Sequence, residues 1–281
     1  MLNPSNAERR GSVLSHLGLV QVQGVDAIPF LQGQLSNDLT KLAPGAVMLA
    51  GLHNPQGRSI ALLRLVLIAP ELVLAVLPKE LVTPVIARLS KFVLRAKVKI
   101  TDASEAWAVE GVEAPAGAPL SSIHVIARAE SPSDAAVDPV ATAAWHAREI
   151  AAGMPQVYAA TSEAFVAQML NLDAVGGIAF DKGCYTGQEV IARAHYRGKV
   201  KRRMQRFRTT GSATFTAGGS GALPDGRTFK VVDAIKLPDG RCEFLAVAPL
   251  TMGAIEPEEP ATGGGTTTAV EELPMSYALP E

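Results

Sequence analysis

The chain has 281 residues, of which 48% are hydrophobic and only 5% aromatic, and its formal net charge is −1. A chain of this length forms one large domain or two to three smaller ones, with a core built mainly from Leu, Val, Ile and Ala. A nearly neutral chain has no overall attraction for nucleic acids or membranes, so either partner would need a local charged patch.

The cysteines, Cys184 and Cys242, are too few for a disulfide framework. The N-terminal segment "MLNPSNAERR" lacks the apolar stretch of a secretory signal. The longest apolar run, residues 60–69, is interrupted by Arg64 and is about half of the roughly 20 residues that span a bilayer. We therefore expect a cytoplasmic protein without membrane contact, and we interpret this run as a buried strand.

The first part of the chain mixes strand-like and helical patterns. Asp26 is the expected N-cap of a helix that runs toward Ser36, with Pro29 in its first turn. A second helix is expected over residues 79–92, and the turn "HNPQGR" separates two antiparallel strands. The strands are expected at residues 17–23, 48–52, 59–69, 71–77, 97–102 and 106–112. This order predicts an α+β fold rather than a doubly wound parallel sheet.

From residue 113 onward, the composition and the expected secondary structure change. Residues 113–139 are rich in Ala, Pro, Ser and Gly, which is typical of a loop-rich crossing, and short helices are expected at 145–153 and 162–170. Beyond Gly198, short strands at 200–207, 228–235 and 242–250 alternate with Gly/Asp turns, which predicts a small antiparallel barrel followed by an exposed tail. We expect three parts, over residues 1–112, 113–198 and 199–281.

The stretch "KGCYTGQEV", residues 182–190, raises a question of chemistry. Thr186 and Glu189 fit a capping box at the start of a helix that runs from about residue 187 to 194 or 195. Cys184 then precedes a helix N-terminus and lies near Lys182, and both features favour a thiolate. The pattern leaves two interpretations open, a small buried apolar residue or a reactive thiol, whereas Cys242 is expected to be packing.

Metal and hydrolase chemistry are not favoured by this stretch. One thiol cannot hold a structural zinc ion or an iron–sulfur cluster unaided, so we expect no stably bound metal, and a second molecule would have to supply the other ligands. His195 lies two to three helical turns from Cys184, too far for a hydrogen bond within one helix, which argues against a Cys–His hydrolase.

Residues 193–208 carry eight Lys or Arg and no acid. Such a run can attract phosphates, and Tyr196 and Phe207 could stack on bases. The alternative is a solvated strand face, and the basic residues do not fall on one side of a strand. We therefore do not expect direct nucleic-acid binding, and a few arginines that contact a carboxylated or phosphorylated small molecule are the more economical interpretation.

The segments "GQLSNDL" and "HNPQGR" concentrate polar side chains beside apolar strands. Amides and carboxylates can recognise the edge of a heterocycle in a pocket. Turn and cap chemistry explains Asn37, Asp38 and Asn54 equally well without a ligand.

Taken together, "FLQGQLSND", "NPQGR", "RAKVKITD" and "KGCYTGQEVIARAHYRGKVKRR" resemble the YgfZ-type folate-binding proteins. That family is related to the aminomethyltransferase (T-protein) of glycine cleavage and to a mitochondrial factor that helps to mature [4Fe-4S] proteins. The resemblance covers about residues 17–102 and 162–208. It implies a ring of two α+β parts and a C-terminal antiparallel β-barrel, with a central channel for tetrahydrofolate. It also implies a role in the assembly or repair of iron–sulfur proteins, which indirectly supports tRNA modification.

The resemblance also implies site residues and partners. Cys184 and Lys182 correspond to the reactive part of the family motif. The residues expected on the folate side are Asn37, Asp38, Asn54, Arg58, Tyr185, Gln188, Glu189, Arg193 and Arg197. The expected partners are folate and iron–sulfur client or scaffold proteins.

One departure from the T-proteins bears on activity. Ala61 and Leu62 stand where the T-proteins have an Asp-Asp pair that orients folate for one-carbon transfer. Neither side chain can accept a proton or hold a charged amine, so we expect an accessory factor rather than an aminomethyltransferase. A folate-dependent one-carbon transferase or demethylase that uses other polar groups stays open as the alternative.

Overall fold

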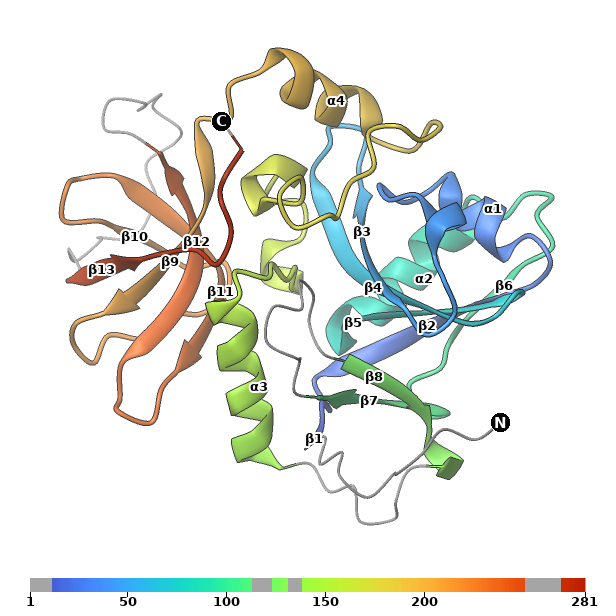
Figure 1. Cartoon of the computed structure of the whole chain (residues 1–281), viewed down its shortest axis with the longest axis horizontal. Coiled ribbons are helices and arrows are strands. Elements are labelled where there is room, and N and C mark those ends of the chain that lie inside the picture. Colours follow the sequence, from blue (N-terminus) through green and yellow to red (C-terminus); the bar gives the residue numbers. More distant parts are fainter. Residues whose placement is uncertain (1–11, 113–122, 131–137, 251–268, 281) are drawn as a thin grey trace.

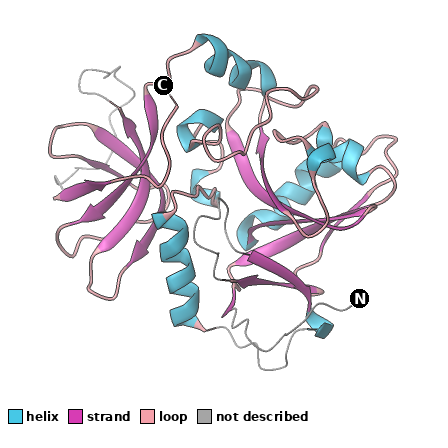
Figure 2. Ribbon diagram, viewed as in Figure 1, coloured by secondary structure: helices cyan, strands magenta, loops and turns pink. Residues whose placement is uncertain are grey.

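The computed structural model describes residues 12–112, 123–130, 138–250 and 269–280. Its strands form three sheets in which every paired strand is antiparallel. Figure 1 shows a strand-rich body on one side, which contains the two sheets formed by β1 to β8, and a curled C-terminal sheet on the other side. Figure 2 shows strands gathered into sheets with helices beside them, which is typical of an α+β fold.

The large N-terminal sheet has the strand order β3-β4-β5-β2-β6. Its strands are β2 (Leu17–Gln23), β3 (Val47–His53), β4 (Ser59–Ala69), β5 (Leu72–Pro78) and β6 (Lys99–Asp102). Strand β4 is buried along most of its length, which explains its nearly continuous apolar sequence. The accompanying helices are α1 (Ala27–Gln32), α2 (Val82–Ser90) and the 3-10 turns η1 (Leu39–Lys41) and η2 (Lys79–Leu81).

A small sheet of β1 (Ser12–Val13), β7 (Trp107–Gly111) and β8 (Ile123–Ala127) extends the body. Because β7 pairs with β8, this sheet joins strands on both sides of residue 112, where the sequence places a boundary between parts. Helix α3 (Pro139–Ala151) follows, after the 3-10 turn η3 (Arg128–Glu130). The Asp138 carboxylate caps α3 by accepting the backbone N–H groups of Val140 and Ala141.

The connection to the last sheet is mostly irregular. It contains the 3-10 turns η4 (Ala159–Thr161) and η5 (Ala167–Leu170) and then helix α4 (Gln188–Arg197). The C-terminal sheet has the order β10-β11-β12-β9-β13 and curls into a half-barrel (Figure 1). Its strands are β9 (Arg202–Thr209), β10 (Ser220–Ala222), β11 (Thr228–Lys236), β12 (Cys242–Pro249) and β13 (Val270–Leu273).

One hydrophobic core joins the body to the C-terminal sheet. It runs from the N-terminal sheet through the irregular connection to Met204, Val232 and Leu245 of the half-barrel. Helix α3 also contacts β11 and β12. A separate core inside the half-barrel is built on stacked phenylalanines, of which Phe207 and Phe244 have ring centroids 5.5 Å apart. The two halves are therefore packed together rather than connected by a free linker.

Two expectations about helices are wrong. Helix α1 ends at Gln32 instead of running toward Ser36. Asp26 is its N-cap residue, as expected, but the carboxylate makes no capping bond and accepts the backbone N–H of Lys97 at 2.7 Å. The segment 162–170 forms only a turn and the short η5 instead of a helix. There Gln168 donates to the backbone oxygen of Ile191 at 2.7 Å, so its side chain serves a tertiary contact.

Four strands were not expected, namely β1, β8, β10 and β13. Strand β8 lies within residues 113–139, where the composition indicated only loop, β10 lies where a Gly-rich turn was expected, and β13 lies in the segment expected to be an exposed tail. All four are short and are completed by pairing with other strands, β1 and β8 with β7, β10 with β11, and β13 with β9. The "GGGTTT" and "EPEEP" segments of the tail lie outside the described residues.

Candidate functional site

The cysteine motif is tied to the loop after α1 by Lys182. Its ammonium group donates to the backbone oxygens of Gln32, Leu35 and Asn37 at 2.8, 2.6 and 2.7 Å. An ammonium group has three donors, so all are used on this loop and none is left for the neighbouring thiol. Burial lowers the pKa of Lys182 to about 8, and its Nζ lies 5.1 Å from the centre of the Tyr185 ring.

The other end of the motif is fixed by Gly187. This residue has a φ of +84°, and a Cβ there would lie 2.6 Å from the backbone oxygen of Asn54 and 3.1 Å from the Cα of Gly57. The Asn54 carboxamide holds the turn in place, because its oxygen accepts the backbone N–H groups of Gln56 and Arg58, both at 3.0 Å. The "NPQGR" and "TGQE" motifs therefore pack directly on each other.

The predicted capping box at Thr186 and Glu189 is wrong. Helix α4 begins at Gln188, its N-cap is Gly187, and no side chain caps it. Because Gly187 takes a left-handed conformation against the turn, the chain enters the helix one residue later than the capping box requires. Cys184 still lies just before the helix, four residues ahead of its first residue.

Asn37 and Asp38 hold the loop that Lys182 contacts. The Asn37 amide donates to the backbone oxygens of Leu49 and Gly176 at 2.7 and 2.8 Å. The Asp38 carboxylate caps η1 by accepting from the backbone and hydroxyl of Thr40 at 3.2 and 2.7 Å. The hydrogen bond from the Thr40 hydroxyl is the main reason that the pKa of Asp38 falls to about 2. Asp38 thus performs cap chemistry, whereas Asn37 ties the loop to β3 and to the segment at Gly176.

The remaining residues expected on the folate side are spread around α4. Arg58 donates to the backbone oxygen of Ala164 at 2.9 Å, and Tyr185 is buried, which raises its pKa to about 12. Glu189, Arg193 and Arg197 are exposed on α4, and Gln188 is half-buried at its start. The structure gathers the sequence-derived residues around one loop, one turn and one helix, and their contact with folate stays a prediction.

The cysteines occupy opposite environments. Cys184 is exposed, whereas Cys242 is buried in β12, where burial raises the pKa of its thiol. The expectation that Cys242 serves packing is confirmed. His195 stacks on Phe180, with ring centroids 3.8 Å apart, so its ring is engaged with a neighbour other than the thiol.

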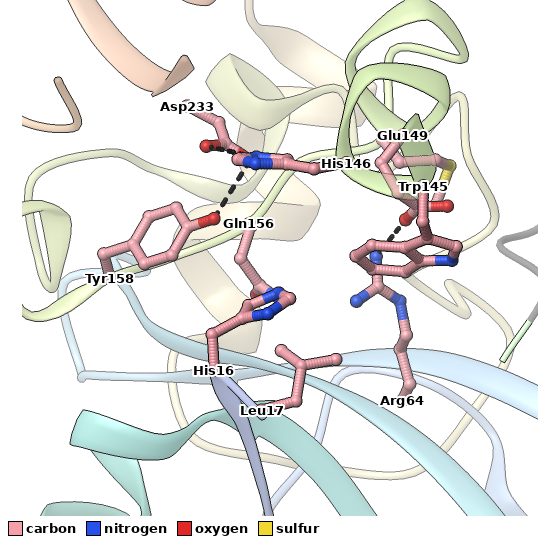
Figure 3. A pocket seen from close by; sticks show the side chains of 10 residues that line it. His16, Leu17, Arg64, Trp145, His146, Glu149, Gln156, Tyr158 and Asp233 are labelled. Atoms are coloured by element: carbon pink, nitrogen blue, oxygen red, sulfur yellow. Dashed lines mark hydrogen bonds and ion pairs between the residues drawn. The ribbon is translucent and has the colours of Figure 1, made fainter. Parts of the chain in front are cut away.

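A second polar site lies on the α3 side, where the body meets the half-barrel (Figure 3). Asp233 of β11 accepts from both His146 of α3, at 2.9 Å, and the Tyr158 hydroxyl, at 3.1 Å. One carboxylate thus joins three segments that are distant in sequence. The inner pocket is lined by His16, Leu17, Arg64, Trp145, His146, Glu149, Met154, Gln156, Tyr158 and Asp233.

The pKa values of the two histidines of this site are shifted in opposite directions. Burial by itself would lower the pKa of His146, but the hydrogen bond and the charge of Asp233 outweigh it and raise the pKa. Burial and the nearby His146 lower the pKa of His16 to about 4. Burial, together with Asp233, raises the pKa of Tyr158 well above its ordinary value, so the phenol stays protonated as a donor.

A buried ion pair forms the inner end of the pocket. Arg64 of β4 pairs with Glu149 of α3, and its guanidinium carbon lies 5.7 Å from the centre of the Trp145 ring. Within the described residues, the Nε of Arg64 is buried without a hydrogen-bond partner. An unsatisfied buried donor is costly and is expected to find an acceptor in a water or a ligand.

The pocket opens outward into a cleft of about 580 Å³. This volume lies within the range of about 300–1,000 Å³ that is typical of small-molecule sites. Its walls combine hydroxyls and imidazoles with apolar groups, and they include Ser15, His16, Thr142, His146, Tyr158, Phe215, Thr216 and Ile235. None of the residues expected on the folate side lines this cleft or the inner pocket.

No local sequence motif indicates this cleft, because its residues are far apart in the chain. His146 and Asp233 are 87 positions apart, and no local motif contains both. One signal was available: Arg64 interrupts an otherwise apolar strand, and a charge at a buried strand position needs a partner. The spacing of His146 and Glu149 on one helix was the second, weaker signal.

The described ranges bear on membrane and metal binding as well. None of their helices is both long and apolar enough to cross a bilayer. In the same part of the chain, no group of three or more His, Cys, Asp or Glu side chains is placed to hold a metal ion.

Comparison with solved structures identifies the fold. The chain superposes on the glycine cleavage system aminomethyltransferase T of Bartonella henselae with a TM-score of 0.64, over 85% of this chain and 78% of that one. The two share 14% sequence identity, so this likeness shows the fold alone. The class is therefore the aminomethyltransferase-like fold, in agreement with the expected ring of α+β parts and a C-terminal barrel.

Sequence comparison places the chain within that class. A Haemophilus influenzae protein is 34% identical over 206 residues, which are 69% of this chain and 72% of that protein. The tRNA-modifying protein YgfZ of several Escherichia coli strains is 38% identical over 141 residues, which are 49% of this chain but only 42% of YgfZ. No family model matches the sequence. The chain belongs to the YgfZ family of aminomethyltransferase-like proteins.

Proposed function

We propose that this protein is a folate-binding accessory factor that assists the assembly or repair of iron–sulfur proteins and thereby supports tRNA modification. The observation that carries the proposal is the exposed Cys184 thiol on a loop that is fixed at both ends. A thiol held in one place on the surface can reach a cluster or a persulfide on another protein. Cys184 then acts as a transient ligand or a redox partner.

The comparisons support the tRNA connection and the folate connection separately. The Escherichia coli relatives are named for tRNA modification, and the fold is shared with an aminomethyltransferase of glycine cleavage, a folate-using enzyme class. Ala61 and Leu62 are fully buried in β4, so neither can replace the acids with which the T-proteins orient folate. This favours an accessory role over one-carbon transfer.

The cleft beside α3 fits tetrahydrofolate in size and in the chemistry of its walls. Its hydroxyl and imidazole groups can meet the polar edge of a pterin, and Phe215 and Ile235 can contact the flat ring. Asp233 already accepts from His146, Tyr158 and the backbone N–H of Ala234, so it orients these side chains. In this proposal Tyr158, His146, Thr142 and Thr216 hold the ligand, in place of the residues that the resemblance implies, none of which lines the cleft.

Tetrahydrofolate titration by calorimetry tests the cleft. Ala143 is exposed on α3 and lines the cleft, so Ala143→Trp fills it without disturbing the core. We expect this variant to bind at least about tenfold more weakly, because the indole occupies the ligand's volume. Leu94→Trp, at a position that is 87% exposed and outside the cleft, is the matched control. Equal binding by the two variants would place folate elsewhere, and no binding by the wild type would remove folate from the proposal.

A further inference from the structure

Helix α4 presents an exposed face with the composition of a protein-binding surface. We define the α4 face as Val190, Arg193, Tyr196 and Arg197, together with Lys199 just beyond the helix. At 3.6 residues per turn, the four helical positions fall on one side. Tyr196 is 67% exposed and Val190 is 41% exposed, and the two arginines and Lys199 are exposed as well.

The opposite side of α4 fixes the helix to the body. Ile191 is the buried residue of the helix, and its backbone oxygen accepts from Gln168 at 2.7 Å. The His195 ring stacks on Phe180, and its centroid lies 4.7 Å from that of Tyr196. The exposed tyrosine contacts the edge of this stacked pair, which limits its side-chain freedom before a partner binds.

Within the described residues, Arg193, Arg197 and Lys199 form no ion pair, although Glu189 is exposed on the same side of the helix, four positions before Arg193. Three later arginines of the same basic run differ, because Arg203 pairs with Asp173, and Arg206 and Arg208 pair with Glu243. The α4 face therefore keeps an excess of positive charge, whereas these three arginines are neutralised at the half-barrel.

We infer that the α4 face docks a protein partner that presents acidic side chains next to the site reached by Cys184. Tyr and Arg are the residues most enriched at energetic hot spots of protein interfaces, and unpaired arginines select carboxylates. RNA is the less favoured partner, because the α4 face offers three cations, whereas a strong nucleic-acid interface can make about six to ten phosphate contacts.

The position of the face deepens the proposed function, on which this inference rests. Cys184 is four residues ahead of Gln188, so the two Cα atoms lie within about 14 Å of each other. A partner seated on α4 would bring its own surface to the exposed thiol. The α4 face then selects the protein, and Cys184 acts on it.

Site-specific photocrosslinking in cells tests the inference. A benzophenone amino acid replaces Tyr196 in one variant and Phe92, which is 44% exposed on the body, in the control. We expect the Tyr196 variant to crosslink to a segment of another protein that carries Asp or Glu side chains, identified by sequencing the linked peptide. Adding Arg193→Glu and Arg197→Glu should reduce the yield about tenfold or more.

Three results would overturn the inference. They are crosslinks that nuclease removes, crosslinks to the protein's own chain, and a yield that the charge reversals leave unchanged. The outcome is independent of folate and of iron–sulfur enzyme activity. If the Tyr196 variant gives no crosslink but restores iron–sulfur enzyme activity in cells that lack the protein, the inference alone is contradicted. If it gives the crosslink but restores no iron–sulfur enzyme activity, the proposed function alone is contradicted.

Discussion

Gly187 lies so close to Asn54 that no side chain fits between them. A Cβ on Gly187 would stand 2.6 Å from the Asn54 backbone oxygen, well inside normal contact distance. The contact joins the loop that carries Cys184 to the turn between β3 and β4. Together with the three hydrogen bonds of Lys182, it fixes the orientation from which the thiol faces solvent.

Replacement of Gly187 by Ala tests this contact. We expect a loss of about 2–5 kcal/mol in the free energy of unfolding, from the left-handed backbone and from displacement of the turn. Gly176→Ala is the matched control, because Gly176 also has a positive φ of +70° but nothing within 4 Å of its Cβ. The control should lose only about 1–2 kcal/mol. Equal losses in urea unfolding would show that the contact with Asn54 is unimportant.

Lys182→Met removes the three hydrogen bonds to the loop after α1. Hydrogen bonds to charged groups contribute about 1.5–3 kcal/mol net each, but the variant also removes the cost of burying the ammonium group, so we expect a loss of about 2–4 kcal/mol. Lys41 lies on the same loop and forms exposed ion pairs with Asp38 and Asp181. Lys41→Met should therefore cost less than about 1 kcal/mol. A Lys182 variant as stable as the Lys41 variant would contradict the anchoring role.

The bond between His146 and Asp233 should make stability depend on pH. The pKa of His146 is raised in the folded protein above 6.5. Its stabilising contribution is therefore complete below pH 6.5 and is lost as the pH rises through the higher, folded pKa, by about 1.4 kcal/mol for each pH unit between the two values.

Urea unfolding of the wild type and His146→Gln checks this prediction above pH 6.5, where His16, with a pKa of about 4 in the folded state, no longer contributes. The difference in unfolding free energy between the two proteins should shrink as the pH rises. A difference that is constant with pH would mean that His146 serves only as an uncharged hydrogen-bond donor.

Elements with a clear local sequence pattern could be predicted from the sequence alone. Strand β4 could be predicted because its apolar run is long, and the β3–β4 turn because Asn54 and Gly57 specify it. Strand β8 could not, because its sequence "IHVIA" is short and becomes a strand only by pairing with β7. Local propensity decides little where pairing with another strand completes the hydrogen bonds.

The candidate site divides in the same way. The motif around Cys184 could be found because its residues are contiguous. The hydrogen bonds of Lys182 to the loop after α1 could not be predicted, since the acceptors lie about 145–150 positions earlier. The cleft beside α3 depends on His16, His146 and Asp233, which only the packing of three segments brings together. Among the residues that line the inner pocket, only Arg64 interrupts a local pattern, the apolar run of β4.

The proposed function in iron–sulfur protein assembly or repair depends most directly on the thiol of Cys184. The decisive measurement is the activity of [4Fe-4S] enzymes in cells that lack this protein and receive either the wild type or Cys184→Ser, at equal soluble expression. Because Cys184 is exposed, the serine variant should fold normally. We predict that the wild type restores the enzymes and the variant does not. Full restoration by the variant, or no defect in cells without the protein, would contradict the account.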